Sequence, residues 1–346
     1  MDARKAAPAE GGISTRRARE SKSMPGMDFA GTFLDSRVLL TEAAIVERLR
    51  HECGARLDDH VNHAGLLYDA PGSLGGLYRQ YIAIARRFEL PILVMTPTRR
   101  VNKLTLARSA YRERNLIPDS VAFLESIRAE NGPFSGKIFI GGHLGCQGDA
   151  YAADGALCRA EARRFHRHQV ARFAETRADF LFAGIMPAVE EAEGMAEAMA
   201  ESGLPYILSL MVRKDGRLLD GTAIVEAIGR IDERAFPPPL CYMSNCVHPA
   251  NLRLALESDL NRRSPRLQRF VGLQANASPL GPEELDGSET LHRTDFDELV
   301  REMGRLRGDF GFKILGGCCG TDDRFLKKLA HGLTQDPPSH SDAPHA

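Results

Sequence analysis

Two cysteine-containing segments carry the residues whose types and spacing are best suited to chemistry. Near the C-terminal end, an apolar run leads through two glycines to the adjacent thiols of Cys318 and Cys319, and a helix is expected to follow with Thr321 as its N-cap. Upstream, a second apolar run ends at Cys246, again ahead of a helical segment. Thiolates bind soft metals, and a helix N-terminus favours thiolate over thiol. The pattern therefore indicates a metal centre.

Zinc is the ion that this set of ligands favours. If both apolar runs are strands of one parallel sheet, Cys246 and the Cys318–Cys319 pair emerge at the same edge. Three thiolates around an open fourth position are typical of a catalytic zinc. The glycines beside the pair allow backbone angles at which neighbouring thiols converge on one ion. The alternatives are three buried, packed cysteines or a disulfide between Cys318 and Cys319.

The remaining cysteines are assigned to packing, with one exception. Cys241 falls within a predicted strand, and Cys53 and Cys158 lie on or beside helical segments, so we expect them to be packed. Cys146 lies in a glycine-rich loop at the edge of the site, and both roles stay open for it. The total of seven cysteines is odd and resembles no disulfide framework, which predicts a reducing, cytoplasmic environment.

Eight short apolar runs alternate with amphipathic segments, which predicts a (β/α)8 TIM barrel of the α/β class. Without that count, a doubly wound sheet would be equally compatible. The expected strands are Val38–Leu40, Pro91–Thr96, Lys137–Gly142, Asp179–Ile185, Tyr206–Met211, Leu240–Asn245, Phe270–Gln274 and Phe312–Gly317. The expected helices are Ala160–Thr176, Ala188–Glu201, Thr222–Ile231, Pro249–Glu257, Phe296–Leu306 and Asp323–Leu333, with extra helix between residues 61 and 89.

The predicted organisation is a single domain with a tail at each end. Residues 1–30 are expected to form a disordered tail, residues 31–334 the barrel, and residues 335–346 a flexible tail. Basic and acidic side chains nearly cancel, at 45 against 46, so neither nucleic acid nor an anionic membrane is an expected partner. No apolar run reaches the length needed to span a membrane.

The cysteine motifs resemble those of the zinc-dependent homocysteine S-methyltransferases. The similarity lies in Asn245 and Cys246 followed by Pro249, and in the Gly-Gly-Cys-Cys-Gly motif of residues 316–320. Weaker similarity covers Gly142–Gly155, Pro187 with Glu191 and Ala192, and Ser209 with Asp220, Gly221 and Thr222, over a span of about Val38 to Leu333. The resemblance implies that Cys246, Cys318 and Cys319 bind a zinc ion that activates the substrate thiol.

The segments expected to bind the substrate depart from the family pattern. Members usually carry an Asp-Gly-Gly type loop after the first strand, where this chain has Glu42 without the glycines. They also usually carry a glutamate that recognises the substrate ammonium just ahead of the proline after the fourth strand, where this chain has Gly184. Glu42, Glu190 or Glu191 compensates, or the thiol substrate is not a free amino acid. For Glu190 and Glu191, the favoured interpretation is a solvated first helical turn.

The other candidate substrate-binding residues are Thr98, Ser209, Asn245 and Asn276. Thr98 belongs to the segment after the second strand, where Arg99 or Arg100 could pair with a substrate carboxylate or remain solvated. Asn245, Ser209 and Asn276 are pocket candidates by position and resemblance, and each could equally stabilise a loop.

The resemblance implies transfer of a methyl group to homocysteine, giving methionine. The chain has no tryptophan for a cage around a quaternary ammonium, so a sulfonium donor, S-methylmethionine or S-adenosylmethionine, is expected instead of betaine. Two alternatives stay open: a zinc enzyme that methylates a different thiol, and a zinc-binding barrel without catalysis.

Overall fold

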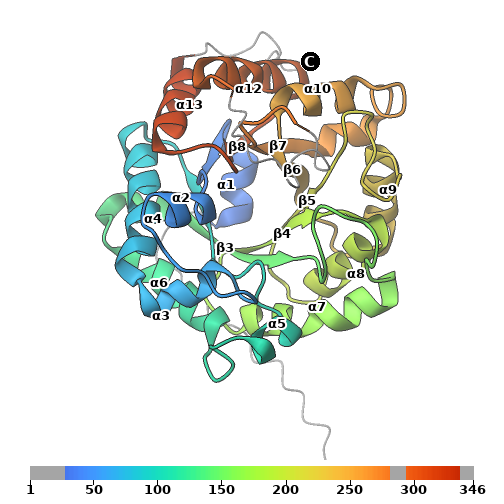
Figure 1. Cartoon of the computed structure of the whole chain (residues 1–346). Helices are drawn as coiled ribbons and strands as arrows, with labels where there is room; N and C mark the ends of the chain where they lie inside the picture. Colours follow the sequence, from blue (N-terminus) through green and yellow to red (C-terminus); the bar gives the residue numbers. More distant parts are fainter. Residues whose placement is uncertain (1–27, 281–293, 336–346) are drawn as a thin grey trace, which may run out of the picture.

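Eight short parallel strands pair in sequence order and close into a barrel (Figure 1). They are β1 (Leu39–Thr41), β2 (Ile92–Met95), β3 (Ile138–Gly145), β4 (Phe180–Met186), β5 (Tyr206–Leu210), β6 (Cys241–Val247), β7 (Phe270–Ala275) and β8 (Ile314–Gly317). The computed structural model describes residues 28–280 and 294–335. Pairing of β1 with β8, which places Leu39 opposite Ile314, closes the ring. The predicted (β/α)8 barrel is confirmed.

Helices accompany the strands, and the longer ones surround the barrel and cover the outer faces of the strands (Figure 1). They are α1 (Phe29–Asp35), α2 (Val46–His51), α3 (Leu66–Asp69), α4 (Pro71–Arg87), α5 (Lys103–Arg108), α6 (Leu116–Ala129), α7 (Arg159–Ala174), α8 (Val189–Ala200), α9 (Ile224–Arg234), α10 (Pro249–Glu257), α12 (Phe296–Phe310) and α13 (Asp323–Gln335). Side chains on both faces of the strands are buried, since one face meets the helices and the other fills the barrel. All six individually predicted helices are present, five of them within three residues at each end, whereas α12 runs four residues beyond its predicted end at Leu306; α3 and α4 confirm the extra helix.

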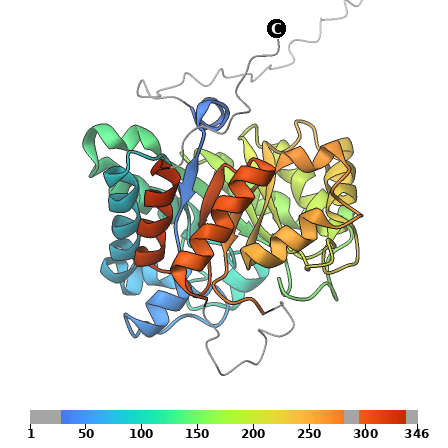
Figure 2. The same ribbon diagram turned by 90° about the horizontal axis from the view of Figure 1, so that it is seen from above.

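Helix α1 closes the N-terminal end of the barrel. This helix was not among those predicted, and Asp28 caps it by accepting a hydrogen bond from the Gly31 N–H at 2.6 Å. The Phe29 ring stacks on the Phe180 ring inside the barrel, with centroids 4.2 Å apart. Figure 2 shows α1 at one end of the barrel, projecting beyond the ring of helices. Residues 1–27 and 336–346, which make up most of the tails predicted at 1–30 and 335–346, lie outside the described residues, whereas Phe29 and Ala30 belong to α1 and Gln335 ends α13.

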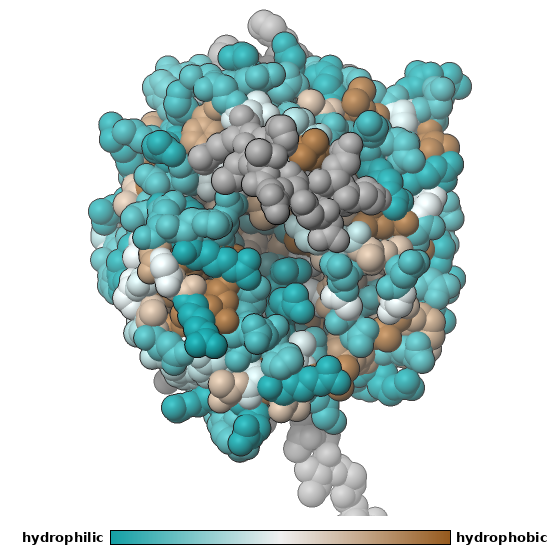
Figure 3. Space-filling view, in the orientation of Figure 1, coloured by the Kyte–Doolittle hydropathy of each residue, from teal (hydrophilic) through white to brown (hydrophobic). Residues whose placement is uncertain are grey.

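The opposite end carries the βα loops and a central hollow. Figure 3 views this end, and hydrophilic side chains border much of the hollow. Two strands bulge as they reach it, β4 between Ala183 and Met186 and β6 between Asn245 and Val247. Bulges redirect side chains at the rim of a barrel, where active sites are built.

Candidate metal centre

The sulfur atoms of Cys246, Cys318 and Cys319 converge at the C-terminal end of the barrel. All three lie within 4.8 Å of one another, with Cys246 Sγ 3.4 Å from Cys319 Sγ and Cys318 Sγ 4.0 Å from Cys319 Sγ. Tetrahedral zinc with bonds of about 2.3 Å to sulfur places its thiolates about 3.8 Å apart. The observed spacings bracket that value, so the three residues fit a zinc ion or a similar soft metal.

The backbone of Cys246 brings its sulfur to this point. Cys246 occupies the bulge of β6 and has φ = 65°, in the left-handed region that non-glycine residues rarely adopt. The only other strand residue of this kind in the described chain is Ile185, with φ = 61°, in the bulge of β4. The left-handed conformation turns Cys246 out of the strand's regular alternation and toward the end of β8.

The glycines before the cysteine pair serve close packing instead of unusual backbone angles. Gly316 and Gly317 are absent from the positive-φ residues, whereas Gly320 has φ = 76°. A Cβ atom on Gly316 would overlap the Thr41 hydroxyl and approach the Thr41 carbonyl oxygen to 2.8 Å. The expectation of special backbone angles therefore holds for Gly320 only. Gly316 is needed because the end of β1 lies directly against it, and Gly317 because a Cβ atom there would overlap the Thr321 hydroxyl of the cysteine turn.

Residues that follow β1 hold the cysteine turn in place. The Gly320 N–H donates to the Glu47 carboxylate at 2.6 Å, and the Gly317 N–H donates to the Glu42 carbonyl oxygen at 3.1 Å. The N-cap of α13 is Asp322, not Thr321 as predicted, because Asp322 Oδ1 accepts from the Arg324 and Phe325 N–H groups. The Thr321 hydroxyl instead donates to the Cys318 carbonyl at 2.6 Å within the turn.

Electrostatic coupling concentrates negative charge on one of the three sulfurs. Hydrogen bonds from the Cys318 and Cys319 thiols, with a further one from Tyr151, hold the pKa of Cys246 well below its usual value. The same contacts raise the pKa of Cys318 and of Cys319. Without a cation, the three sulfurs compete for one negative charge. A divalent cation removes this competition because it stabilises all three thiolates together.

Two polar side chains contact the sulfur of Cys246. The Tyr151 hydroxyl donates to Cys246 Sγ at 3.1 Å, and Asn276 Nδ2 donates to it at 3.5 Å. Asn276 was predicted as a site residue and does lie at the centre. Tyr151 was not, because its role depends on the conformation of the loop between β3 and α7. Its position near Asp154 and Gly155, in a segment already matched to a family, is the signal that could have directed attention to it.

Residues 39–333 match the model of a protein family described as homocysteine S-methyltransferase. This chain belongs to that family. It is 26% identical over 219 residues to the S-methylmethionine–homocysteine S-methyltransferase BHMT2 of Pongo abelii, covering 55% of this chain and 56% of that protein. It is 25% identical over 213 residues to betaine–homocysteine S-methyltransferase 1 of Mus musculus, covering 55% and 50%. The chain thus spans about half the length of the curated relatives that it matches.

A solved structure shares the fold. The metallated form of the homocysteine methyltransferase MmuM from Escherichia coli superposes with a TM-score of 0.67 at 20% identity, covering 87% of this chain and 98% of that one. At this identity the likeness supports the barrel architecture alone. Within the described residues, no helix combines the length and apolarity that crossing a membrane requires.

The other predicted substrate-binding residues of this homocysteine S-methyltransferase family member lie near the ends of the strands. Ser209 donates to Asn245 Oδ1, and both side chains are buried. The Thr98 hydroxyl is buried and donates to the His143 carbonyl at 2.8 Å. Thr98 thus joins the segment after β2 to β3. Their roles in substrate binding stay predictions.

Glu42 is a buried carboxyl at the end of β1. The Met95 N–H lies 3.2 Å from Oε1 and 3.3 Å from Oε2, and only 7% of the residue is exposed. Burial raises the pKa of Glu42 to about 8, against the opposing effect of backbone hydrogen bonds. At neutral pH, the carboxyl is therefore mostly protonated. An uncharged carboxyl gives an ammonium group no ionic partner.

A histidine fills the space beside Gly184, where the family usually carries a glutamate. A Cβ atom on Gly184 would overlap His143 Nε2. This nitrogen is buried and has no hydrogen-bond partner among the described residues. Burial, reinforced by the charge of Arg99, holds the pKa of His143 well below its usual value, so the ring is neutral. The space beside Gly184 is thus occupied by a neutral imidazole.

The neighbouring glutamates differ from each other. Glu190 is exposed, as expected for a solvated first turn of α8. For Glu191 that interpretation is wrong, because the residue is fully buried. Its carboxylate lies 3.1 Å from His166 Nε2 and accepts from the Gln147 N–H at 2.6 Å. Glu191 therefore anchors the start of the loop that carries Tyr151.

The structure separates the remaining cysteines into three groups. Cys241 packs inside the barrel, where burial raises its pKa to about 12, as the packing prediction requires. Cys53 and Cys158 are exposed, so the packing prediction is wrong for both. Both lie just outside a helix, Cys53 after the end of α2 and Cys158 at the N-cap of α7, so neither turns toward the core. Cys146 is buried, its pKa is raised to about 12 by burial, and it lines a pocket beside the centre.

Proposed function

We propose that this protein is a zinc-dependent S-methyltransferase that transfers a methyl group from a sulfonium donor to the thiol of homocysteine, giving methionine. The observation that carries the proposal is the convergence of three cysteine sulfurs at spacings suited to zinc. Membership of the homocysteine S-methyltransferase family supports the reaction class. The expected partners are a small thiol and a small methyl donor.

The reaction joins one thiolate to one methyl group. When bound by Cys246, Cys318 and Cys319, zinc would lower the pKa of the substrate thiol and hold it as a thiolate. The thiolate attacks the methyl carbon, the new carbon–sulfur bond forms, and the sulfonium bond to that carbon breaks. Anion and cation thereby become two neutral thioethers, and no general base is needed. Tyr151 and Asn276 orient Cys246 through their hydrogen bonds.

A sulfonium donor suits this sequence better than a quaternary ammonium. The chain has no tryptophan, the best aromatic partner for a quaternary ammonium. One relative is described as using S-methylmethionine, and S-adenosylmethionine is the second candidate. All seven cysteines are free in the structure, which favours a reducing compartment such as the cytoplasm.

A different thiol acceptor is the second candidate function. It is favoured by His143 in the space beside Gly184 and by the neutral Glu42, since neither offers a charge to an ammonium group. A zinc-binding barrel without catalysis is the third outcome that the experiment below separates.

Metal content measured beside methyl transfer tests the proposal. We expect about one zinc per chain in the wild type, and loss of that zinc in Cys246→Ser and Cys318→Ser, because each variant removes a thiolate ligand. Isotope-labelled methyl transfer from each sulfonium to homocysteine should be lost with the metal. Cys158→Ser is the matched control, since Cys158 is exposed and lies at the N-cap of α7, where serine is favourable.

Other outcomes would point elsewhere. Full activity in metal-free protein would overturn the proposal. Turnover of another thiol without turnover of homocysteine would favour the second candidate. Zinc and thiol binding with no transfer from any donor tested would favour a non-catalytic barrel.

A further inference from the structure

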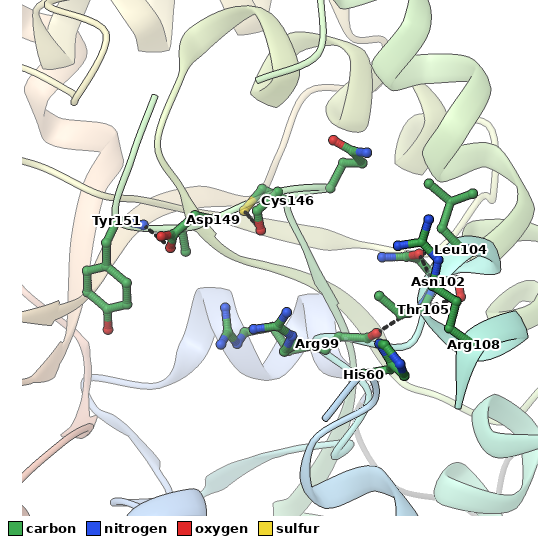
Figure 4. A pocket seen from close by; sticks show the side chains of 13 residues that line it. His60, Arg99, Asn102, Leu104, Thr105, Arg108, Cys146, Asp149 and Tyr151 are labelled. Atoms are coloured by element: carbon green, nitrogen blue, oxygen red, sulfur yellow. Dashed lines mark hydrogen bonds between the residues drawn. The ribbon is translucent and has the colours of Figure 1, made fainter. Parts of the chain in front are cut away.

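A cavity of about 450 Å³ opens beside the metal centre, between the loops that follow β2 and β3. Its lining includes the guanidinium groups of Arg99, Arg100 and Arg108, together with His60 and Tyr151. We call this cavity the arginine pocket. In Figure 4 the side chain of Arg99 reaches across it, from the side that carries His60 toward Tyr151.

The charges in the arginine pocket are not balanced by the protein. Among the described residues, none of its three guanidinium groups forms an ion pair, and Asp149 is the only carboxylate in the lining. Three positive charges against one negative charge leave an excess of two. Elsewhere in the described chain, Arg79, Arg128 and Arg163 each lie 2.6 Å from a carboxylate oxygen. An unpaired cluster of guanidiniums is a binding site for carboxylate, sulfonate or phosphate groups.

The arginine pocket adjoins the three sulfurs through a shared wall. Tyr151 lines the pocket, and its hydroxyl contacts Cys246 Sγ at 3.1 Å. Arg99 also lies against the end of β3, because a Cβ atom on Gly145 would meet Arg99 Cγ at 2.8 Å. The loop after β2 is thus held closely over β3. A small molecule with its sulfur at the centre can extend past Tyr151 into the pocket.

The charge state of two other side chains near the ends of the strands supports the same assignment. The space beside Gly184 holds a neutral imidazole, and the buried Glu42 is mostly protonated at neutral pH. The barrel mouth therefore offers guanidinium groups to an anion and no ionised carboxylate at these positions to a cation. We propose that the arginine pocket binds the anionic end, a carboxylate or sulfonate, of the thiol acceptor whose sulfur is held at Cys246, Cys318 and Cys319. This inference rests on the proposed function and specifies its substrate class.

Calorimetric titration of the zinc-loaded, full-length protein with three thiols tests the inference. γ-Mercaptobutyrate carries the carboxylate without an ammonium, mercaptopropylamine carries the ammonium without a carboxylate, and homocysteine carries both. We expect γ-mercaptobutyrate to bind at least about tenfold more tightly than mercaptopropylamine, because a charge-assisted hydrogen bond to a guanidinium favours the anion. Mercaptopropanesulfonate should bind like γ-mercaptobutyrate.

Substitutions assign the effect to the arginine pocket. Arg99→Gln and Arg100→Gln should each raise the Kd for γ-mercaptobutyrate about tenfold and leave that for mercaptopropylamine nearly unchanged. Arg99→Lys should lie between wild type and Arg99→Gln, since it keeps the charge and loses the bidentate geometry. Arg112→Gln is the matched control, because Arg112 is exposed, lies nearby in sequence and does not line the pocket. Retained zinc in every variant shows that the fold and the centre are intact.

The result separates this inference from the proposed function. If γ-mercaptobutyrate fails to bind, or binds equally well to wild type and both glutamine variants, the inference is overturned, whether or not homocysteine is methylated. If binding depends on the arginines but no methyl transfer is found, the inference holds and the methyltransferase proposal fails.

Discussion

The backbone of Cys246 stores strain at the position where its sulfur is needed. A non-glycine residue at φ = 65° costs of order 1 kcal/mol or more, and such outliers persist where surrounding structure imposes them. Here the imposing structure is the β6 bulge against β7. The sequence reveals that Cys246 ends a strand. It does not reveal the bulge, which depends on register with a strand that follows later in the chain.

Glu42 gives the protein a pH-dependent stability with a defined sign. The folded state keeps the carboxyl proton up to a pKa of about 8, whereas the unfolded chain releases it near 4.5. Between these values the folded state binds more protons, so the free energy of unfolding falls as pH rises, by up to about 1.4 kcal/mol per pH unit. Glu42→Gln should remove this contribution, since glutamine does not titrate.

Urea unfolding of wild type and Glu42→Gln at several pH values checks this expectation. The difference in the free energy of unfolding between wild type and Glu42→Gln should change steadily between pH 4.5 and about 8, and it should level off below pH 4.5. Parallel stability curves for the two proteins would show that Glu42 is ionised in the folded state, contrary to its burial.

At the scale of elements, the strands and the C-terminal helices could be predicted because each is a short apolar or amphipathic run. The details of their ends could not, since the β6 bulge depends on the register with β7, and the sequence does not show which of the adjacent Thr321 and Asp322 caps α13. The arginine pocket could not be predicted from the sequence either, because it depends on how two loops fold together. Arg99 and Arg100 were visible as candidates, yet only the fold of two loops brings them beside Tyr151 and Arg108.

Because β8 packs directly against β1, one methyl group added at Gly316 should lower the stability of the protein markedly. In Gly316→Ala, the new Cβ would overlap the Thr41 hydroxyl and lie 2.8 Å from the Thr41 carbonyl oxygen. Because backbone atoms must then move, we expect the free energy of unfolding to fall by about 1–3 kcal/mol. Zinc affinity should fall as well, since β8 leads directly into Cys318.

Gly304→Ala is the control for this substitution. Gly304 lies in α12 with no atom within 4 Å of an added Cβ, so alanine there should stabilise the helix by up to about 1 kcal/mol. Chemical denaturation and zinc titration of both variants provide the measurements. Equal effects of the two substitutions would show that β1 moves to accommodate the added methyl group with no loss of stability.

At the scale of the whole molecule, stability and chemistry are placed at opposite ends of the barrel. Phe29 of α1 is 3% exposed and packs on Phe180 at one end, while the cysteines lie at the other. Phe29→Ala should lower the free energy of unfolding by about 3–5 kcal/mol through loss of buried ring contacts. Zinc content at temperatures well below the transition should stay at the wild-type level.

Leu34→Ala provides the comparison within the same helix. Leu34 is 72% exposed, so its truncation should change stability by less than about 0.5 kcal/mol. Thermal unfolding followed by circular dichroism measures both. If Phe29→Ala were as stable as Leu34→Ala, α1 would not be part of the folded core.

The hydrogen bond from Gly320 to Glu47 joins residues 273 positions apart in sequence. The turn bearing two of the three thiols is thus assembled only when the first β/α unit has docked onto the eighth. Uptake of the proposed zinc would therefore report ring closure during folding. A chain whose first and eighth units had not yet met would leave Cys246 apart from Cys318 and Cys319, with their thiols open to oxidants.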